Sequence, residues 1–281
     1  MDIHHFFSAS RALIVAGKGG VGKTTVSRAL ATVATRADMR VLLVEIDAKS
    51  DDPPAIAGVD HMRLSAGAAL SEYLQGRGLG VLTRQLDRLG IVDLVASTAP
   101  GIDDLLVLGK IKQLVRDDSH DVIIIDGPAA GHAIDLLRAP RTLKKTVIGG
   151  PIAQQADDVM QMFADESLFR AMLVTKPAMT PVQELLETAT SIRDALGVSL
   201  SPVVVNGLHP SVPPAVSVDT PGVNAARDYM AARNRAELAA VTALSESIDV
   251  RQLHAGHHVS TGSELVARVA GDLQDAIEDL Q

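Results

Sequence analysis

The chain has 281 residues, a formal net charge of -8 and no cysteine. The missing cysteines exclude disulfides, thiolate metal sites and thiol catalysis, and the acidic balance argues against a surface that neutralises nucleic-acid phosphates. Hydrophobic residues make up 47% of the chain but aromatic residues only 2%, so aliphatic side chains must fill the core, as they do in parallel sheets covered by helices.

The sequence shows no secretory pattern in its first residues and no membrane-spanning run. Residues 1–11 lack the basic start and long apolar stretch of a secretory signal, and no apolar run reaches the length that spans a bilayer. The sequence therefore predicts a cytoplasmic protein, which a partner could hold at the membrane periphery.

Short apolar runs alternate along the chain with segments whose apolar residues recur at helical spacing. Strands are predicted over residues 12–16, 41–46, 122–125, 146–148, 171–174 and 202–205, and helices over 23–35, 105–115 and 181–196. This alternation predicts an α/β fold with a doubly wound, mostly parallel sheet.

Two stretches depart from the alternation. Glycines and short amphipathic pieces at 70–74 and 82–89 predict helices outside the sheet, and the four prolines of residues 209–222 predict an ordered loop. We expect one domain over residues 1–281, with a small helical elaboration around 55–120 and a further candidate at 151–170.

A glycine-rich segment follows the first predicted strand and opens the first predicted helix. It fits G-x-x-x-x-G-K-[ST], in which backbone N–H groups converge on phosphate oxygens, Lys23 meets the β- and γ-phosphates and Thr24 ligates Mg²⁺. A glycine-rich turn without nucleotide is the alternative. The pattern predicts P-loop NTPase topology with ATP and Mg²⁺ as cofactors, and the nucleotide-binding residues are Gly17, Lys18, Gly19, Gly20, Val21, Gly22, Lys23, Thr24 and Thr25.

Two carboxylates directly follow predicted strands. Asp47 comes after residues 41–46 and Asp126 after residues 122–125, and side chains at the carboxyl ends of such strands face the ligand crevice. Asp47 could polarise the attacking water, although a turn or helix cap is the alternative. Asp126 could hold Mg²⁺ together with Thr24.

The additional lysine inside the loop, Lys18, gives the K-G-G-V-G-K-T form. In this the chain resembles the deviant Walker A ATPases, which include the ParA and MinD proteins, nitrogenase iron protein, the arsenite-pump ATPase and the ATPases that target tail-anchored proteins. In that group the lysine reaches the phosphates of a second subunit. The resemblance therefore implies a homodimer, or a heterodimer with a related ATPase, and a catalytic role for Lys18.

Further motifs over roughly residues 11–210 make the chain similar to the ArsA-related branch of that group. Asp47 matches the switch I aspartate, while Asp126, Gly131 and His132 match switch II. Asn206 occupies the position of the asparagine that contacts adenine in the family. The resemblance implies an ATP hydrolase whose nucleotide cycle alters the exposure of a surface for a protein or membrane-protein cargo.

Two departures from the family pattern limit this reading. Switch I of the family reads D-P-A-H-S, whereas Ala48 and Lys49 follow Asp47 here, and the lack of cysteine excludes arsenite capture by thiolates. Two other functions therefore stay open: an ATP-binding regulatory subunit with little activity of its own, and a positioning ATPase of the ParA or MinD kind.

Three remaining clusters have a structural and a functional interpretation. His254, His257 and His258 favour a polar surface segment over a metal site, and the methionines and phenylalanines of residues 160–172 favour core packing over a cargo groove. The amphipathic segment 264–280 is acidic, which favours docking on the sheet over binding to anionic lipid.

Overall fold

The computed structural model describes residues 1–46, 55–76, 101–147, 149–211 and 221–280. Its centre is a sheet with the strand order β3-β2-β4-β1-β5-β7-β8, to which β6 is added by pairing with β5. Every strand pair in these ranges is parallel. The strands are β1 (Ala12–Gly17), β2 (Val41–Ile46), β3 (Val59–Leu64), β4 (Val122–Ala129), β5 (Phe169–Thr175), β6 (Ser199–Leu200), β7 (Val203–Leu208) and β8 (Gln252–Gly256).

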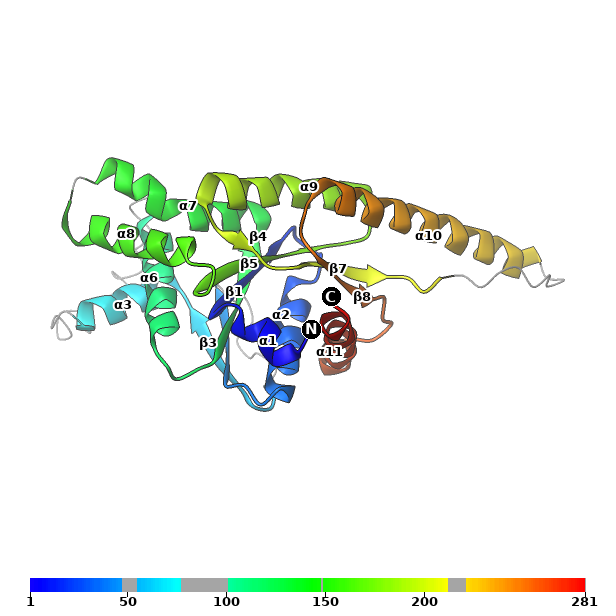
Figure 1. Cartoon of the computed structure of the whole chain (residues 1–281), viewed down its shortest axis with the longest axis horizontal. Coiled ribbons are helices and arrows are strands. Elements are labelled where there is room, and N and C mark those ends of the chain that lie inside the picture. The colour runs from blue at the N-terminus through cyan, green and yellow to red at the C-terminus, as the bar shows by residue number, and fades with distance from the viewer. Residues whose placement is uncertain (47–54, 77–100, 148, 212–220, 281) are drawn as a thin grey trace.

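The helices cover both faces of this sheet (Figure 1). They are α1 (Ile3–Ser8), α2 (Lys23–Arg36), α3 (Ala66–Gly76), α6 (Ile102–Arg116), α7 (Ala130–Thr146), α8 (Gly150–Ala164), α9 (Met179–Thr190) with a π-helical turn at Ser191–Ala195, α10 (Pro221–Ser247) and α11 (Gly262–Glu278). One core cluster joins the sheet to α1, α2 and α11, and the other joins it to α6, α7, α8 and α9. The doubly wound α/β fold predicted from the sequence is therefore confirmed.

The central strands are buried on both faces. All six residues of β1 are buried, and β2 and β5 are nearly as enclosed. Continuous aliphatic runs form such strands because helices remove both faces of a parallel sheet from water. Burial of this kind fixes the position of the loops at the carboxyl ends of the strands.

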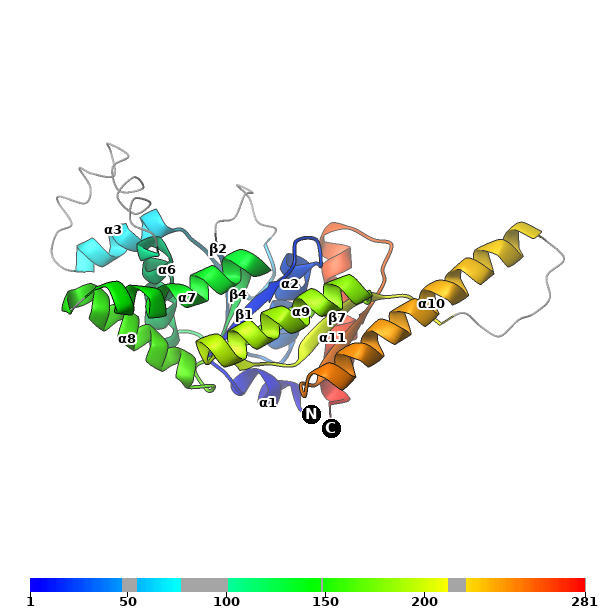
Figure 2. The same cartoon turned by 90° about the horizontal axis from the view of Figure 1, so that it is seen from above.

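Helices extend beyond the sheet at both ends of the molecule. Helices α3, α6, α7 and α8 gather at one end, and α10 extends beyond the sheet at the other (Figure 2). The two chain ends lie side by side between them, because the ammonium of Met1 donates to the carbonyls of Glu278 at 2.6 Å and Leu280 at 2.8 Å.

The strand expected over residues 146–148 is wrong. Helix α7 continues to Thr146, and the N–H of Val147 still donates to the carbonyl of Leu143 at 2.8 Å. Ile148 lies outside the described residues. A run of three apolar residues is too short to override an amphipathic helix whose Leu136, Leu137 and Leu143 face the core.

Three described strands were not predicted, namely β3, the two-residue β6 and β8. The edge strand β3 has exposed polar residues on it, and β8 mixes buried Leu253 and Ala255 with exposed polar side chains. Neither segment has the continuous apolar run by which buried parallel strands are recognised. The predicted pieces at 82–89 and most of the loop at 209–222 lie outside the described residues.

Two of the three clusters with a structural and a functional interpretation pack against the core. Met162, Phe163, Phe169 and Met172 are all buried in the core, which leaves no groove formed by these four side chains. Helix α11 buries its apolar face against α2 and β8. Within the described part of the chain, no helix has the length and apolarity needed to cross a membrane.

The ion pair between Arg40 and Asp121 joins the starts of β2 and β4. Asp121 accepts from Arg40 Nη2 at 2.7 Å and from its backbone N–H at 2.8 Å, and these bonds lower the pKa of Asp121 from 3.8 to about 2. A carboxyl group with a depressed pKa stabilises the fold above its ordinary pKa, and this contribution is lost as the pH falls through the folded value.

We therefore expect Asp121→Asn to lower the urea midpoint at neutral pH, and the gap to wild type to close as the pH falls from about 4 toward about 2. Asp249→Asn is the matched control, since Asp249 lies at an exposed position away from this ion pair. A gap that stays constant over this pH range would rule out the ion pair as its cause.

Candidate functional site

The glycine-rich loop joins β1, in the middle of the sheet, to the first turn of α2. Gly20 and Gly22 have φ angles of 84° and 97°, which residues with a Cβ atom rarely adopt. Gly22 is the N-cap of α2, so the loop presents backbone N–H groups and the positive end of a helix to the same space. Val21 is buried and anchors the loop in the core.

The hydroxyl of Thr24 and the carboxylate of Asp126 meet below this loop. Thr24 Oγ1 donates to Asp126 Oδ2 at 2.6 Å, and Ser27 Oγ donates to Asp126 Oδ1 at 3.2 Å. The parallel pairing of β1 with β4 sets Val15 opposite Asp126 and so brings the end of β4 beneath the start of α2. Ser27 was missed from the sequence, although its place one turn after Thr24 is a usable signal.

The charges at this point are held in a partly dry environment. Burial raises the pKa of Asp126 above its ordinary value, against the opposing effect of the hydroxyl groups of Thr24 and Ser27. Burial lowers the pKa of Lys23, and this effect outweighs the charge of Asp126, which acts to raise it. An opposite charge would stabilise the ionised form of each group. Mg²⁺ would do so for Asp126 and phosphate for Lys23.

The residues present fit a nucleotide with its metal. Hydroxyl and carboxylate oxygens are the ligands that Mg²⁺ prefers, and Thr24 and Asp126 offer one of each. Lys23 Nζ donates to the carbonyl of Lys18 at 3.3 Å and thus lies across the loop, where a phosphate-binding cation is needed.

Lys18 lies within the loop, but its side chain turns toward another element. The Nζ atom forms an ion pair with Glu184 Oε1 of α9, while the other carboxylate oxygen of Glu184 is buried without a hydrogen-bond partner in the described part of the chain. The sequence contains no signal for this contact, because the two residues are 166 positions apart. Lys18 is still 53% exposed, so it is reachable from outside the chain.

Asn206 lies directly behind the phosphate loop. Its amide Nδ2 donates to the carbonyl of Val21 at 2.8 Å, and the side chain is buried. The end of β7 is thereby fixed to the loop. Contact of Asn206 with adenine stays a prediction.

Asp47 lies outside the described residues, but the strand before it is well placed. β2 pairs with β4 so that Glu45 is opposite Asp126. Glu45 is buried and accepts from Arg28 Nη2 at 2.8 Å, and His61 Nε2 lies 3.3 Å from its second oxygen. This group of three residues ties β2 to α2.

Of the predicted switch II residues, Gly131 and His132 lie in the first turn of α7, while Asp126 belongs to β4. His132 is exposed at the start of α7. His254, His257 and His258 have different neighbours, namely Gln252, His209 and Asp272. Among the described residues no three metal-ligating side chains are grouped to hold an ion.

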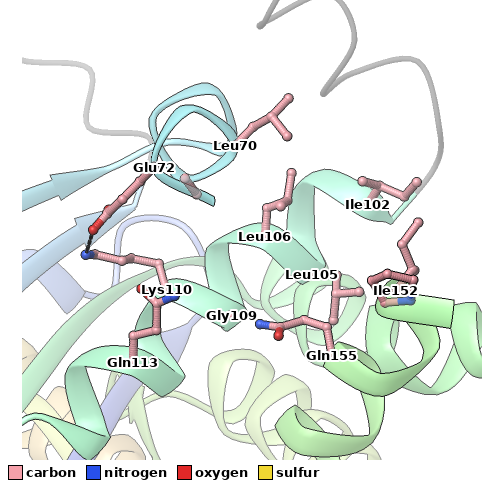
Figure 3. Close-up of a pocket in the computed structure, with 12 residues that line it drawn as sticks. Leu70, Glu72, Ile102, Leu105, Leu106, Gly109, Lys110, Gln113, Ile152 and Gln155 are labelled. Carbon is pink, nitrogen blue, oxygen red and sulfur yellow. Dashed lines mark hydrogen bonds and ion pairs between the residues drawn. The ribbon is translucent and has the colours of Figure 1, made fainter. Parts of the chain in front are cut away.

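A second feature is an apolar groove among α3, α6 and α8, distant in sequence from the phosphate loop. Leu70, Ile102, Leu106 and Ile152 line it, with an ion pair between Lys110 and Glu72 at its rim (Figure 3). Its lining residues fall within the ranges 55–120 and 151–170, where the sequence predicted a helical elaboration.

The fold and the phosphate loop together define a nucleotide-binding α/β protein of the P-loop class. Within that class the chain belongs to the anion-transporting ATPase family, whose model matches residues 10–52 and 80–196. The resemblance to ArsA-related ATPases is thereby confirmed.

Individual relatives agree with this family. The chain is 31% identical over 224 residues to the ATPase BagA of Mycobacterium tuberculosis. The matched region covers 71% of this chain and 65% of that protein. It is 26% identical to a putative arsenical pump-driving ATPase of Halobacterium salinarum over 72% of this chain and 36% of the relative. The ATPase get3 of Schizosaccharomyces pombe is 29% identical over 55% of this chain and 53% of its own length. The chain thus spans less than two thirds of these proteins.

The conformation of Gly22 provides a test of the loop. A Cβ atom at Gly22 would collide with the amide of Asn206, whereas a Cβ atom at Gly19 would have no atom within 4 Å. We expect Gly22→Ala to lower the free energy of unfolding by about 1–3 kcal/mol, because strain and displacement of Asn206 add together. Gly19→Ala is the matched control with little effect. Equal denaturant midpoints for the two variants would contradict this geometry.

Proposed function

We propose that the chain is a Mg²⁺-dependent ATPase that converts ATP to ADP and phosphate. The observation that carries the proposal is the contact of Thr24 with Asp126 at 2.6 Å beneath the phosphate loop. This is the pair of oxygen ligands that P-loop enzymes use to hold Mg²⁺ on the phosphates of the nucleotide. Membership of an ATPase family supports it independently.

Each residue of the site has a role in this reaction. Lys23 and the N–H groups of the loop neutralise the β- and γ-phosphates, while Thr24 and Asp126 hold the metal that shares their charge. Asp47, which follows β2, orients the attacking water. Asn206 braces the loop through Val21 and faces the adenine.

Lys18 acts in a dimer under this proposal. Its exposed ammonium leaves Glu184 and reaches the phosphates bound by a second, related subunit. The exchange replaces the ion pair with Glu184 by one with phosphate when the partner carries ATP. Supporting this role are the K-G-G-V-G-K-T form of the loop and the exposure of Lys18.

The second candidate is an ATP-binding regulatory subunit. Ala48 and Lys49 replace the family residues after Asp47, and a displaced switch I would leave the attacking water poorly oriented. Such a subunit would bind ATP tightly and turn it over only when mixed with an active partner.

Steady-state phosphate release separates these possibilities. We expect Lys23→Ala, Thr24→Ala and Asp47→Asn each to reduce turnover by about a hundredfold or more, because each removes stabilisation of the transition state or of its water. Lys145→Ala, at an exposed position on α7, is the control with wild-type turnover. Indistinguishable rates in all variants would refute the catalytic assignment, and tight ATP binding without turnover would favour the regulatory subunit.

We further propose that the apolar groove receives a hydrophobic helix of a protein or membrane-protein cargo. The support is its lining of leucine and isoleucine side chains from three helices, with polar groups at the rim (Figure 3). An amphipathic helix binds such a groove through apolar residues at helical spacing.

Two groove substitutions test the cargo proposal. We expect Leu106→Gln and Ile152→Gln to weaken binding of a fluorescent leucine-faced helical peptide by about tenfold, as each puts a polar group against the bound apolar face. Val259→Gln is the control, since Val259 is 98% exposed and lies outside the groove. Equal affinities in fluorescence anisotropy would exclude the groove as the peptide site.

A further inference from the structure

A cavity with charged residues in its lining lies on the face of the sheet covered by α9 and α10. It has a volume of about 430 Å³ and opens where β5, β7 and β8 end. Lys176 follows β5, Gly207 belongs to β7 and His257 follows β8, while Arg233 and Glu237 come from α10. None of these residues is part of the phosphate loop.

Lys176 is a partly buried cation to which the described residues supply no counter-charge. Within the described part of the chain its Nζ atom forms no ion pair and no hydrogen bond, and burial lowers the pKa of Lys176. Gly207 leaves room for the ammonium, because a Cβ atom at Gly207 would lie 2.9 Å from Nζ. Burying an unpaired ammonium costs free energy that a methionine of similar length would not cost.

Glu237, the one carboxylate among the described residues that line the cavity, is engaged elsewhere. Glu237 Oε1 accepts from Arg233 Nε at 3.1 Å and lies 2.8 Å from His209 Nδ1, and Oε2 accepts from the backbone N–H of His209 at 3.0 Å. Although burial of Glu237 would raise its pKa, these bonds lower it overall. Glu237 therefore balances Arg233 and leaves Lys176 uncompensated.

The rest of the lining suits an organic ligand. Pro177, Met179 and Ala236 form an apolar wall, and Met179 is 57% exposed. His257 also lines the cavity, and its imidazole stacks on that of His209 with ring centroids 4.1 Å apart. This stacking fixes the position of the His257 ring.

We propose that this cavity binds a small organic oxyanion, in which a carboxylate or phosphate pairs with Lys176 beside Arg233 and a short apolar part contacts Met179 and Ala236. The bound anion supplies the charge that Lys176 lacks. The site is separate from the phosphate loop, and the proposal does not depend on ATP hydrolysis.

Nuclear magnetic resonance of the full chain tests the site directly. The imidazole signals of His257, assigned with His257→Gln, are followed during titration with butyrate, with monobutyl phosphate and with uncharged butyramide. We expect saturable shifts with one or both anions and none with butyramide. The same shifts are expected in Lys23→Ala, because the phosphate loop is not involved.

Variants then separate the site from adventitious binding. Lys176→Met should keep the fold, since its ammonium has no partner to lose, and should weaken anion binding at least tenfold. Ala236→Glu places a carboxylate in the cavity and should abolish binding, while Lys145→Met should leave it unchanged. The proposal is overturned if neither anion shifts His257, if Lys176→Met and Ala236→Glu bind as wild type does, or if the shift disappears in Lys23→Ala.

Discussion

The hydrogen bond between Thr24 and Asp126 is the contact on which the rest of the site depends. It joins the helix that opens after the glycine-rich loop to the strand beside β1, at 2.6 Å, and Ser27 adds a second bond at 3.2 Å. Only the parallel pairing of β1 with β4 brings these residues together, since Thr24 and Asp126 are 102 positions apart. The buried aliphatic strands therefore set the geometry at which phosphate and metal would be held.

The buried charges of the same site favour the binding of ligands with opposite charge. Burial destabilises the charged forms of both Asp126 and Lys23, so binding opposite charges recovers free energy that folding has cost. Glu45 is held by Arg28 and His61 and adds negative charge near Asp126. These contacts link the phosphate helix to the strand that precedes Asp47.

Local sequence patterns predicted the phosphate loop and the carboxylate that it meets. The glycine-rich loop, Lys23 and Thr24 follow from one motif, and Asp126 follows from an acid after an apolar run, because parallel strands bring their carboxyl ends to one edge. Long-range side-chain contacts were not predictable: Glu184 with Lys18, Asn206 with Val21, and the cavity around Lys176 depend on strand order and on the course of α9 and α10. The strands β3 and β8 were not predicted for another reason. Their exposed polar residues interrupt the apolar run by which a buried strand is recognised.

The most direct test of the account is the energetic coupling between Mg²⁺ and ATP, measured by calorimetry at equilibrium. If Thr24 and Asp126 hold the metal on the phosphates, Mg²⁺ should tighten ATP binding to the wild-type chain at least tenfold, and Asp126→Asn should remove most of this gain. Equal tightening by Mg²⁺ in wild type and Asp126→Asn would contradict the central role given to this contact.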